Sequence, residues 1–481
     1  MSDPAAPTPA SPAPAAPGAP PAASDQPNWA PFSRVAVVAA VAGWVLFAVA
    51  AVTNLGAAEG EDAKHAAQSR IMVGYLSGFT YWFSLPLGAM CLLMIRYVAK
   101  SSWGLLLTRP LEAATRTLPL TILLFVPLVG AVTLAHGQFS PYPWSHHDEH
   151  EKEEKKDDAK AAAPGDKRDQ AIEASKVMVR RAKEHQKQIH ETHEKDHKNR
   201  FEAIYGFLTP MGFVVVSAVL FLIWGTMIFL LNKWGKETSE ATDPAVVDRG
   251  LEKLQNLSGP GIIVFALTIT AAATQWVMSL EVGWASTMFP VIFAVNQFLT
   301  AFAFCLALFL TVCGMPPFKA HMRPKFQLDM GTLLLAFTMF WSYTSFSQFM
   351  LIWIGNLPEE IPFYLKRSNE TGWYWVSAAL IALHFALPFL LLLFRNIKLH
   401  PGRLRLVALY LLVICAVDVI WWIAPSAAES AFALPWLIDV GAILGIGGVW
   451  GLFFLYQLKQ RPLFPDNQAF LLPEGHHHEQ H

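Results

Sequence analysis

The chain has 481 residues, of which 53% are hydrophobic and only 15% are charged, whereas soluble proteins carry about 25% charged residues. A water-soluble globule cannot hide so much apolar surface, so the composition excludes that class and predicts an integral membrane protein. The formal charge of −1 leaves no excess of basic residues for nucleic acid, and we expect no nucleic-acid partner.

Apolar runs long enough to cross a bilayer core, about 20 residues each, follow a tail at 1–30. That tail is almost entirely Pro, Ala and Ser, which predicts disorder. Transmembrane helices are predicted in two blocks, 31–135 and 207–458, separated by an insertion at 136–206 and followed by a C-terminal tail at 459–481. The ten predicted spans lie near 34–55, 71–97, 117–135, 207–231, 259–281, 289–313, 329–354, 373–394, 404–424 and 436–457.

The distribution of Lys and Arg indicates how these spans are oriented. An even number of spans places both termini on one side of the membrane. The loops on that side contain most of the Lys and Arg near the spans, whereas the short loops on the opposite side contain only Lys64, Arg70, Lys366 and Arg367. Because positive charges are retained in the cytoplasm, we predict that both termini are cytoplasmic and that the 136–206 insertion is periplasmic.

The 136–206 insertion is charged and rich in histidine. Eight of the 16 histidines lie in it, and good helix formers between Asp166 and Arg200 predict a helix. His190, His193 and His197 fall on one face of that helix, which is compatible with a metal or proton-collecting site. We favour the alternative, a solvated helix that lies against a partner and binds no metal.

Ionisable residues inside membrane spans are costly, so they are candidates for function. The proton-handling candidates are Glu281 at the end of the fifth span, His384 in the eighth, Asp418 in the ninth, and Asp439 and Asp329 at the starts of the tenth and seventh. Stabilisation of a helix start explains Asp439 and Asp329 about equally well. For Asp418 the alternative is a hydrogen-bonded structural acid, and for His384 it is a bond to a backbone carbonyl.

Other polar residues predict a wetted path or the environment of a quinone headgroup. Gln275 lies on the fifth span and His136 at an outer edge, while Tyr343, Ser345 and Gln348 lie on the seventh span. Hydrogen bonding between helices is an equally good explanation for such residues.

We predict that the chain binds no cofactor of its own. A b-type haem needs axial ligands, and the spans offer only His384 at depth, with His136 at an edge. The four cysteines lie in apolar runs without a CxxC or CxxCH pattern, which leaves disulfides, zinc sites, iron–sulfur clusters and covalent haem unsupported.

Two sequence blocks carry a resemblance to a known family. Residues 275–289 read Gln-Trp-Val-Met-Ser-Leu-Glu-Val-Gly-Trp-Ala-Ser-Thr-Met-Phe, and residues 356–360 read Asn-Leu-Pro-Glu-Glu. With these blocks the chain resembles the NrfD/polysulfide-reductase-like membrane subunits of bacterial alternative complex III, a quinol:cytochrome c oxidoreductase. It is most similar to the smaller such subunit, the ActF type, over residues 30–460.

The resemblance implies a fold, a set of partners and a location. Family members form two four-helix bundles, spans two to five and six to nine, flanked by the first and tenth helices. They sit in the bacterial inner membrane beside a larger NrfD-like paralogue and subunits that carry haem c and iron–sulfur clusters, and a terminal oxidase is a further partner. They contribute quinone cavities and proton routes, so this chain would belong to an enzyme complex without being catalytic alone.

Two departures from the family pattern bear on a proton route. Relatives often carry Asp before the Trp of the first block and Pro-His after its Leu-Glu pair. This chain has Gln275, Val282 and Gly283 at those positions, so a route through this region must use Glu281 or another residue.

Two alternatives to the respiratory subunit stay open. A secondary transporter also fits two similar bundles with interrupted helices, and Pro86 and Pro388 interrupt spans two and eight. The other alternative is a structural scaffold that holds the redox subunits of the complex together.

Overall fold

The computed structural model describes residues 27–101, 103–134, 139–146, 208–281, 284–315, 319, 323–357, 360–368, 372–427 and 436–463. These ranges are built from helices, with no strand among them. Nine helices of the described part are long and apolar enough to cross a membrane. The prediction of an all-α integral membrane protein is therefore confirmed.

The helices of the first half are α1 (Ala30–Gly56), α2 (Glu61–Ala99), α3 (Trp103–Thr115), α4 (Leu118–Thr133), η3 (Pro143–His146), α7 (Pro210–Glu240), α8 (Pro244–Trp276) and η4 (Met278–Leu280). Those of the second half are α9 (Phe289–Val312), α11 (Pro324–Gly355), α12 (Ile361–Ser368), α13 (Trp373–Leu380), η5 (Ile381–Ala386), α14 (Leu387–Leu393), α15 (Arg395–Leu399), α16 (Pro401–Ile423), η6 (Ala424–Ser426) and α17 (Trp436–Lys459).

Local sequence signals set several helix ends. Thr209 accepts a hydrogen bond from the amide of Gly212, and Asp243 accepts one from Ala245, so both act as N-caps directly before a proline. At the other end of α11, Asn356 adopts the left-handed conformation (φ 45°), which asparagine tolerates better than most residues.

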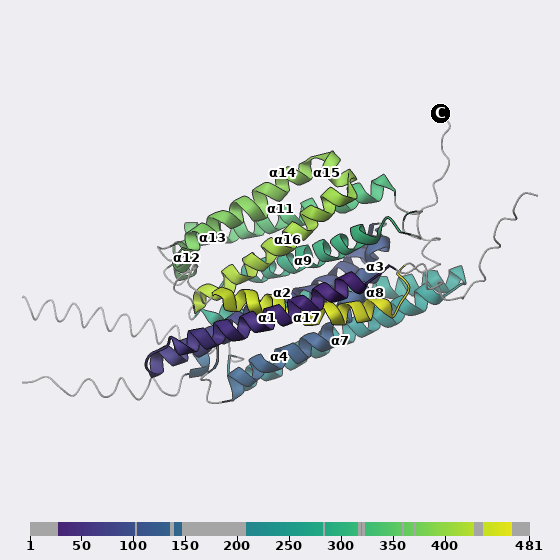
Figure 1. Cartoon of the computed structure of the whole chain (residues 1–481). Helices are drawn as coiled ribbons and strands as arrows, with labels where there is room; N and C mark the ends of the chain where they lie inside the picture. Colours follow the sequence, from purple (N-terminus) through teal and green to yellow (C-terminus); the bar gives the residue numbers. More distant parts are fainter. Residues whose placement is uncertain are drawn as a thin grey trace, which may run out of the picture.

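The helices of each half of the chain pack on one another, and one pair of helices lies along them (Figure 1). The first group contains α2, the α3–α4 pair, α7 and α8. The second contains α9, α11, the α13–α14 pair and α16. Helices α1 and α17 pack along each other, and α17 also packs on α2. Helix α2 also packs on α9 and α16, so the two groups are in direct contact.

Glycines allow α1 and α17 to approach closely. A Cβ added at Gly445 would lie 3.0 Å from the Trp44 ring, and one added at Gly441 would lie 2.6 Å from the backbone nitrogen of Phe47. Small residues at such positions let membrane helices pack backbone to backbone. Since Gly441 faces Phe47 and Gly448 faces Ala40, the two helices are antiparallel. The start of α1 and the end of α17 therefore lie at the same end of the molecule.

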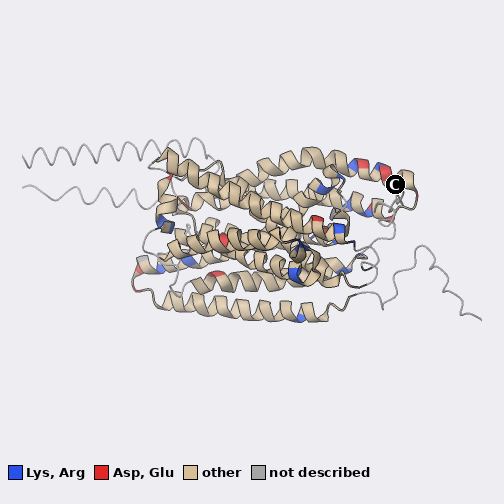
Figure 2. Cartoon of the chain, turned by 90° about the horizontal axis from the view of Figure 1, so that it is seen from above, with Lys and Arg blue, Asp and Glu red and all other residues tan. Residues whose placement is uncertain are grey.

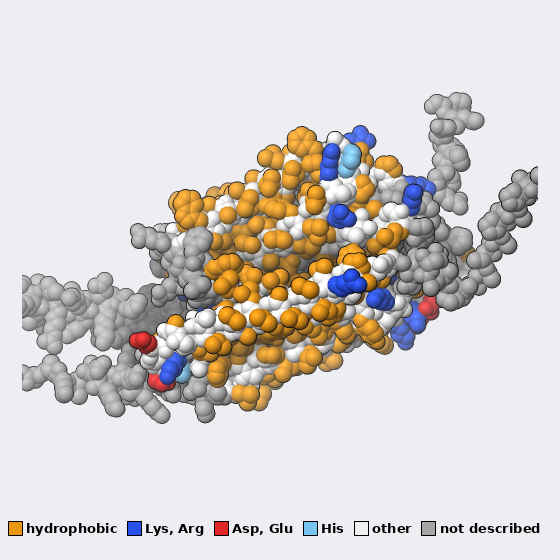
Figure 3. Space-filling view, viewed as in Figure 1, with side chains coloured by type: hydrophobic (Ala, Val, Ile, Leu, Met, Phe, Trp, Pro, Cys, Tyr) orange, Lys and Arg blue, Asp and Glu red, His pale blue; other side chains and the backbone are white. Residues whose placement is uncertain are grey.

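The molecule has an apolar middle and two polar ends. Figure 3 shows hydrophobic side chains over the middle of one face, and in Figure 2 most charged residues lie towards the ends of the helices. We name the two ends by their arginines. At the Arg461 end, Arg461 contacts Glu112 of α3. At the Arg367 end, Arg367 of α12 contacts the last turn of α16.

The structure differs from the predicted spans in three places. The seventh predicted span lies within α11, which is 32 residues long. Because α11 contains many hydroxyl and amide side chains, it is not among the nine helices that are apolar enough to cross a membrane. The third crossing segment starts at Gly104 instead of 117, because only a two-residue turn separates α3 from α4. Arg70, predicted in a loop, lies in α2.

Several predictions fall on residues that the structure leaves undescribed. They concern the disorder of 1–26, the helix and histidines within 147–207, and the tail at 464–481. These segments lie outside the described residues.

Candidate functional site: a buried histidine–aspartate cluster

A cluster of buried polar side chains joins the helices of the second group. Asp418 of α16 accepts a hydrogen bond from Nδ2 of Asn296 on α9 (2.9 Å) and another from the indole Nε1 of Trp341 on α11 (2.8 Å). Both donors reach the same carboxylate oxygen, Oδ2. Asn296 is itself fixed, since its Oδ1 accepts from the hydroxyl of Thr300 (3.2 Å). Asp418 is thus held inside the bundle by two neutral donors from two other helices.

His384 completes the cluster from the π-helical segment η5. Its ring stacks on Trp341 with the ring centroids 3.7 Å apart, and its Nε2 lies 3.6 Å from Sγ of Cys415. Its Nδ1 lies 3.9 Å from Oδ2 of Asp418 and makes no hydrogen bond within the described part of the chain. A shift of about 1 Å would bring this pair to hydrogen-bond distance. The imidazole and the carboxylate are therefore neighbours without a hydrogen bond between them.

The backbone around His384 departs from α-helical hydrogen bonding. The amide of Leu387 donates to the carbonyl of Ala382, five residues earlier, in place of Leu383. The hydroxyl of Tyr410 on α16 donates to the carbonyl of Leu383 (2.6 Å), which satisfies the acceptor that the π turn releases. Such turns occur frequently at functional sites.

Proline at position 388 accounts for part of this irregularity. Pro388 has no amide hydrogen, so it cannot donate to the carbonyl of His384 as an α-helix requires. The proline that we noted as an interruption of the eighth span thus lies one helical turn after the histidine.

Glu281 and Asp439 both lie at the Arg367 end, and each is paired with cations. Glu281 contacts the ammonium group of Lys366 and lies 3.8 Å from Nη1 of Arg367. Asp439, in the first turn of α17, is paired with Arg70 of α2. Both carboxylates are buried, and an ion pair stabilises a buried carboxylate only in its charged form.

Arg367 connects this end of the molecule to the helix that carries Asp418. Its guanidinium group donates to the carbonyls of Phe363 (2.6 Å), Trp421 (3.0 Å) and Trp422 (2.7 Å). Burial lowers the pKa of Arg367 to about 10, and the charge of Glu281 opposes that shift. Asp418 precedes Trp422 by one turn of α16, about 6 Å along the helix axis.

The remaining predicted residues are distributed over both groups. Asp329 is half-buried near the start of α11, about 18 Å along the helix axis from Trp341, so the structure does not bring it to the cluster. Gln275 is buried in the first group, where it accepts from Ser217 and donates to the carbonyl of Gly212, both at 3.4 Å.

The polar residues of α11 face different directions. Tyr343 is 67% exposed and points out of the bundle, and Ser345 is half-buried. Gln348 is buried and lies two turns beyond Trp341 on the same face. The four histidines predicted outside the spans, namely His136, His190, His193 and His197, lie outside the described residues.

Two kinds of site residue were not identified from the sequence. They are the cations that pair with the buried carboxylates, and the cysteine beside His384. Lys366 and Arg367 were assigned only to a loop. Lys and Arg are rare in short loops on the non-cytoplasmic side of a membrane. Two adjacent cations in a loop predicted to lie on that side therefore indicated that they have specific partners. Cys415 gave no signal, because it lies within an apolar run. Within the described ranges, no group of three or more His, Cys, Asp or Glu side chains is placed to hold a metal ion.

A search of models of protein families and of curated proteins finds no match to this chain.

Proposed function

We propose that this protein is a membrane subunit of a respiratory quinol:cytochrome c oxidoreductase of the alternative complex III type. In this role it would provide a proton route and part of the quinone environment, while partner subunits carry haem c and iron–sulfur clusters. The sequence blocks at 275–289 and 356–360 support the assignment, as do the two four-helix groups with their flanking pair.

The observation that carries the proton role is the His384–Asp418 pair. Asp418 is held by neutral donors, so it can gain or lose a proton without breaking an ion pair. His384 is positioned by stacking, and its Nδ1 faces the carboxylate. A proton on Asp418 would pass to Nδ1 when the ring closes the 3.9 Å gap.

The Arg367 end is the side from which we infer that protons reach this pair. Asp418 lies one helical turn from the carbonyls that bind Arg367, whereas the Arg461 end carries most of the Lys and Arg of the loops. Under the positive-inside rule the Arg367 end would be periplasmic, and the cluster would exchange protons with that side.

Proton translocation per electron in the intact complex tests this proposal. Asp418→Asn should lower the proton-to-electron ratio and leave assembly intact, because the amide keeps an oxygen for the two donors but cannot carry the proton. Asp248→Asn, on an exposed position of α8, is the matched control. An unchanged ratio in Asp418→Asn would contradict the proton role and favour a scaffold.

Affinity capture of the chain from its native membrane separates the proposal from the transporter alternative. The eluate should show reducible c-type haem bands that shift on addition of a menaquinol analogue. A colourless single-chain preparation would favour a transporter.

A further inference from the structure

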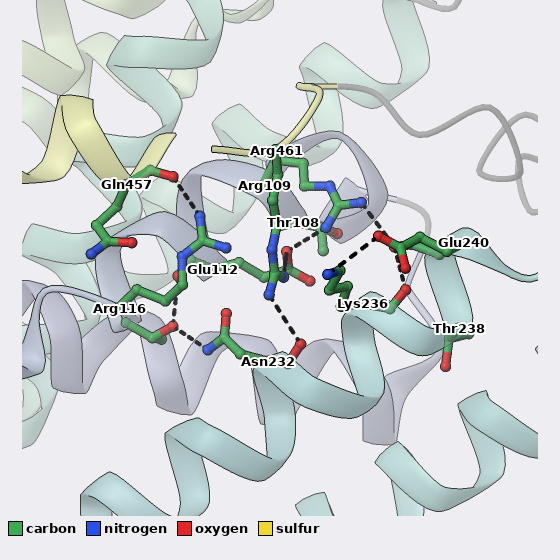
Figure 4. Close-up of polar contacts among 12 residues, drawn as sticks. Thr108, Arg109, Glu112, Arg116, Asn232, Lys236, Thr238, Glu240, Gln457 and Arg461 are labelled. Carbon is green, nitrogen blue, oxygen red and sulfur yellow. Dashed lines mark hydrogen bonds and ion pairs between the residues drawn. The ribbon is translucent and has the colours of Figure 1, made fainter. Parts of the chain in front are cut away.

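A second buried cluster, at the Arg461 end, is independent of the proposed function (Figure 4). Arg109 of α3 and Arg461, two residues beyond α17, both bond to Oε2 of Glu112, at 2.6 and 3.1 Å. Arg116, one turn after Glu112, donates from Nη2 to the backbone carbonyl of Gln457 on α17 (2.7 Å). Two guanidinium groups from α3 and the turn after it, and a third from the segment after α17, thus lie near one carboxylate.

The described residues leave positive charge in excess at this cluster. The side chains of Arg109 and Arg461 are 6% and 17% exposed, and that of Glu112 is 3% exposed. Nε and Nη1 of Arg116, and Nε of Arg109, are buried and have no hydrogen-bond partner in the described part of the chain. Buried charges and buried donors are costly unless they are paired, so the cluster is suited to an anion.

We propose that this cluster binds the phosphate group of an anionic phospholipid. The planar fork of a guanidinium matches two phosphate oxygens, and basic pockets between membrane helices near the bilayer surface bind anionic headgroups.

The surface beside Arg116 suits the rest of a lipid molecule. Helix α4 begins two residues after Arg116, and it exposes Leu123 (65%) and Val126 (57%). In this proposal the acyl chains of a bound lipid would lie along these exposed side chains of α4. A free phosphate ion would use the arginines alone and gain nothing from this face.

Lipid titration of the purified, delipidated full chain tests the proposal. Native mass spectrometry and thermal unfolding report binding of phosphatidylglycerol, of zwitterionic phosphatidylcholine and of inorganic phosphate. Arg116→Gln removes the donors without partners, and Arg461→Gln removes a cation outside the helices in case the first variant does not fold. Lys236→Gln is the control, because Lys236 is a half-exposed cation at the same end that pairs with Glu240 instead of Glu112.

We expect phosphatidylglycerol to bind and stabilise the wild-type chain more strongly than phosphatidylcholine. Arg116→Gln and Arg461→Gln should each weaken that binding about tenfold, as expected for the loss of a charge-assisted hydrogen bond, and Lys236→Gln should leave it within about twofold. Equal binding of the two lipids, or unchanged binding in both arginine variants, would overturn the proposal. Inorganic phosphate that binds as tightly as phosphatidylglycerol would also overturn it and assign the site to a free anion.

Discussion

The contact between α1 and α17 permits a quantitative test at Gly448. A Cβ at this position would lie 2.5 Å from Cα of Ala40, and closer still to the backbone nitrogen of Ala40 and the carbonyl oxygen of Ala36. Nonbonded carbon atoms approach to about 3.5 Å, so Gly448→Ala must open a gap of about 1 Å. Since the opposing atoms belong to the backbone, no side-chain rotation can relieve the clash and the helices must separate.

Gly451, three residues later on α17, supplies a matched control. A Cβ there would meet nothing closer than Cβ of Ala36 at 3.5 Å, an ordinary contact. Replacing glycine by alanine inside a helix gains about 1 kcal/mol in helix propensity at either position, whereas overpacking costs about 1–3 kcal/mol. Gly451→Ala should therefore be neutral or stabilising, and Gly448→Ala should be less stable than Gly451→Ala by about 1–3 kcal/mol.

Reversible unfolding in mixed micelles, followed by circular dichroism, measures this difference. A cysteine pair across α1 and α17 would report separately whether the helices move apart. If Gly448→Ala unfolds within about 0.5 kcal/mol of Gly451→Ala, which is the usual scatter of surface substitutions, the close backbone contact does not exist as described.

Two further predictions concern the buried polar groups. Arg70→Gln should destabilise the protein by about 3–5 kcal/mol, because it leaves Asp439 buried without its cation; adding Asp439→Asn should restore part of the loss, and no recovery would argue against the pair. Trp341→Phe keeps an aromatic ring over His384 but removes the hydrogen-bond donor to Asp418. The free energy of unfolding should therefore fall by about 1.5–3 kcal/mol. Unchanged stability in Trp341→Phe would show that the hydrogen bond is absent.

The helices were predictable from sequence wherever apolar residues run without interruption. Prediction was weakest where polar residues enter a helix, as in α11 and at the α3–α4 turn, because hydropathy alone does not show whether a polar side chain faces a neighbouring helix or a loop. Arg109 and Arg116 precede the third predicted span, which begins near 117. The structure places them in α3 and in the turn that follows it.

The candidate site was predictable only in part. Asp418 and His384 were identifiable as ionisable residues within apolar runs. The partners of Asp418 were not, since Asn296 and Trp341 lie 122 and 77 residues away in sequence. Which side chains meet depends on how each helix is rotated and packed, and a single sequence does not determine that.

The partners of the buried carboxylates separate them into two kinds. Asp439 is paired with Arg70, and Glu281 with Lys366, so a cation lies against each of these carboxylates. Asp418 faces an amide, an indole and a histidine. Neutral donors tolerate either form of the carboxylate, and the histidine offers a second proton acceptor beside it. Of the three, Asp418 is the carboxylate that is hydrogen-bonded by neutral donors and lies beside a histidine, and the proposed proton role rests on this difference.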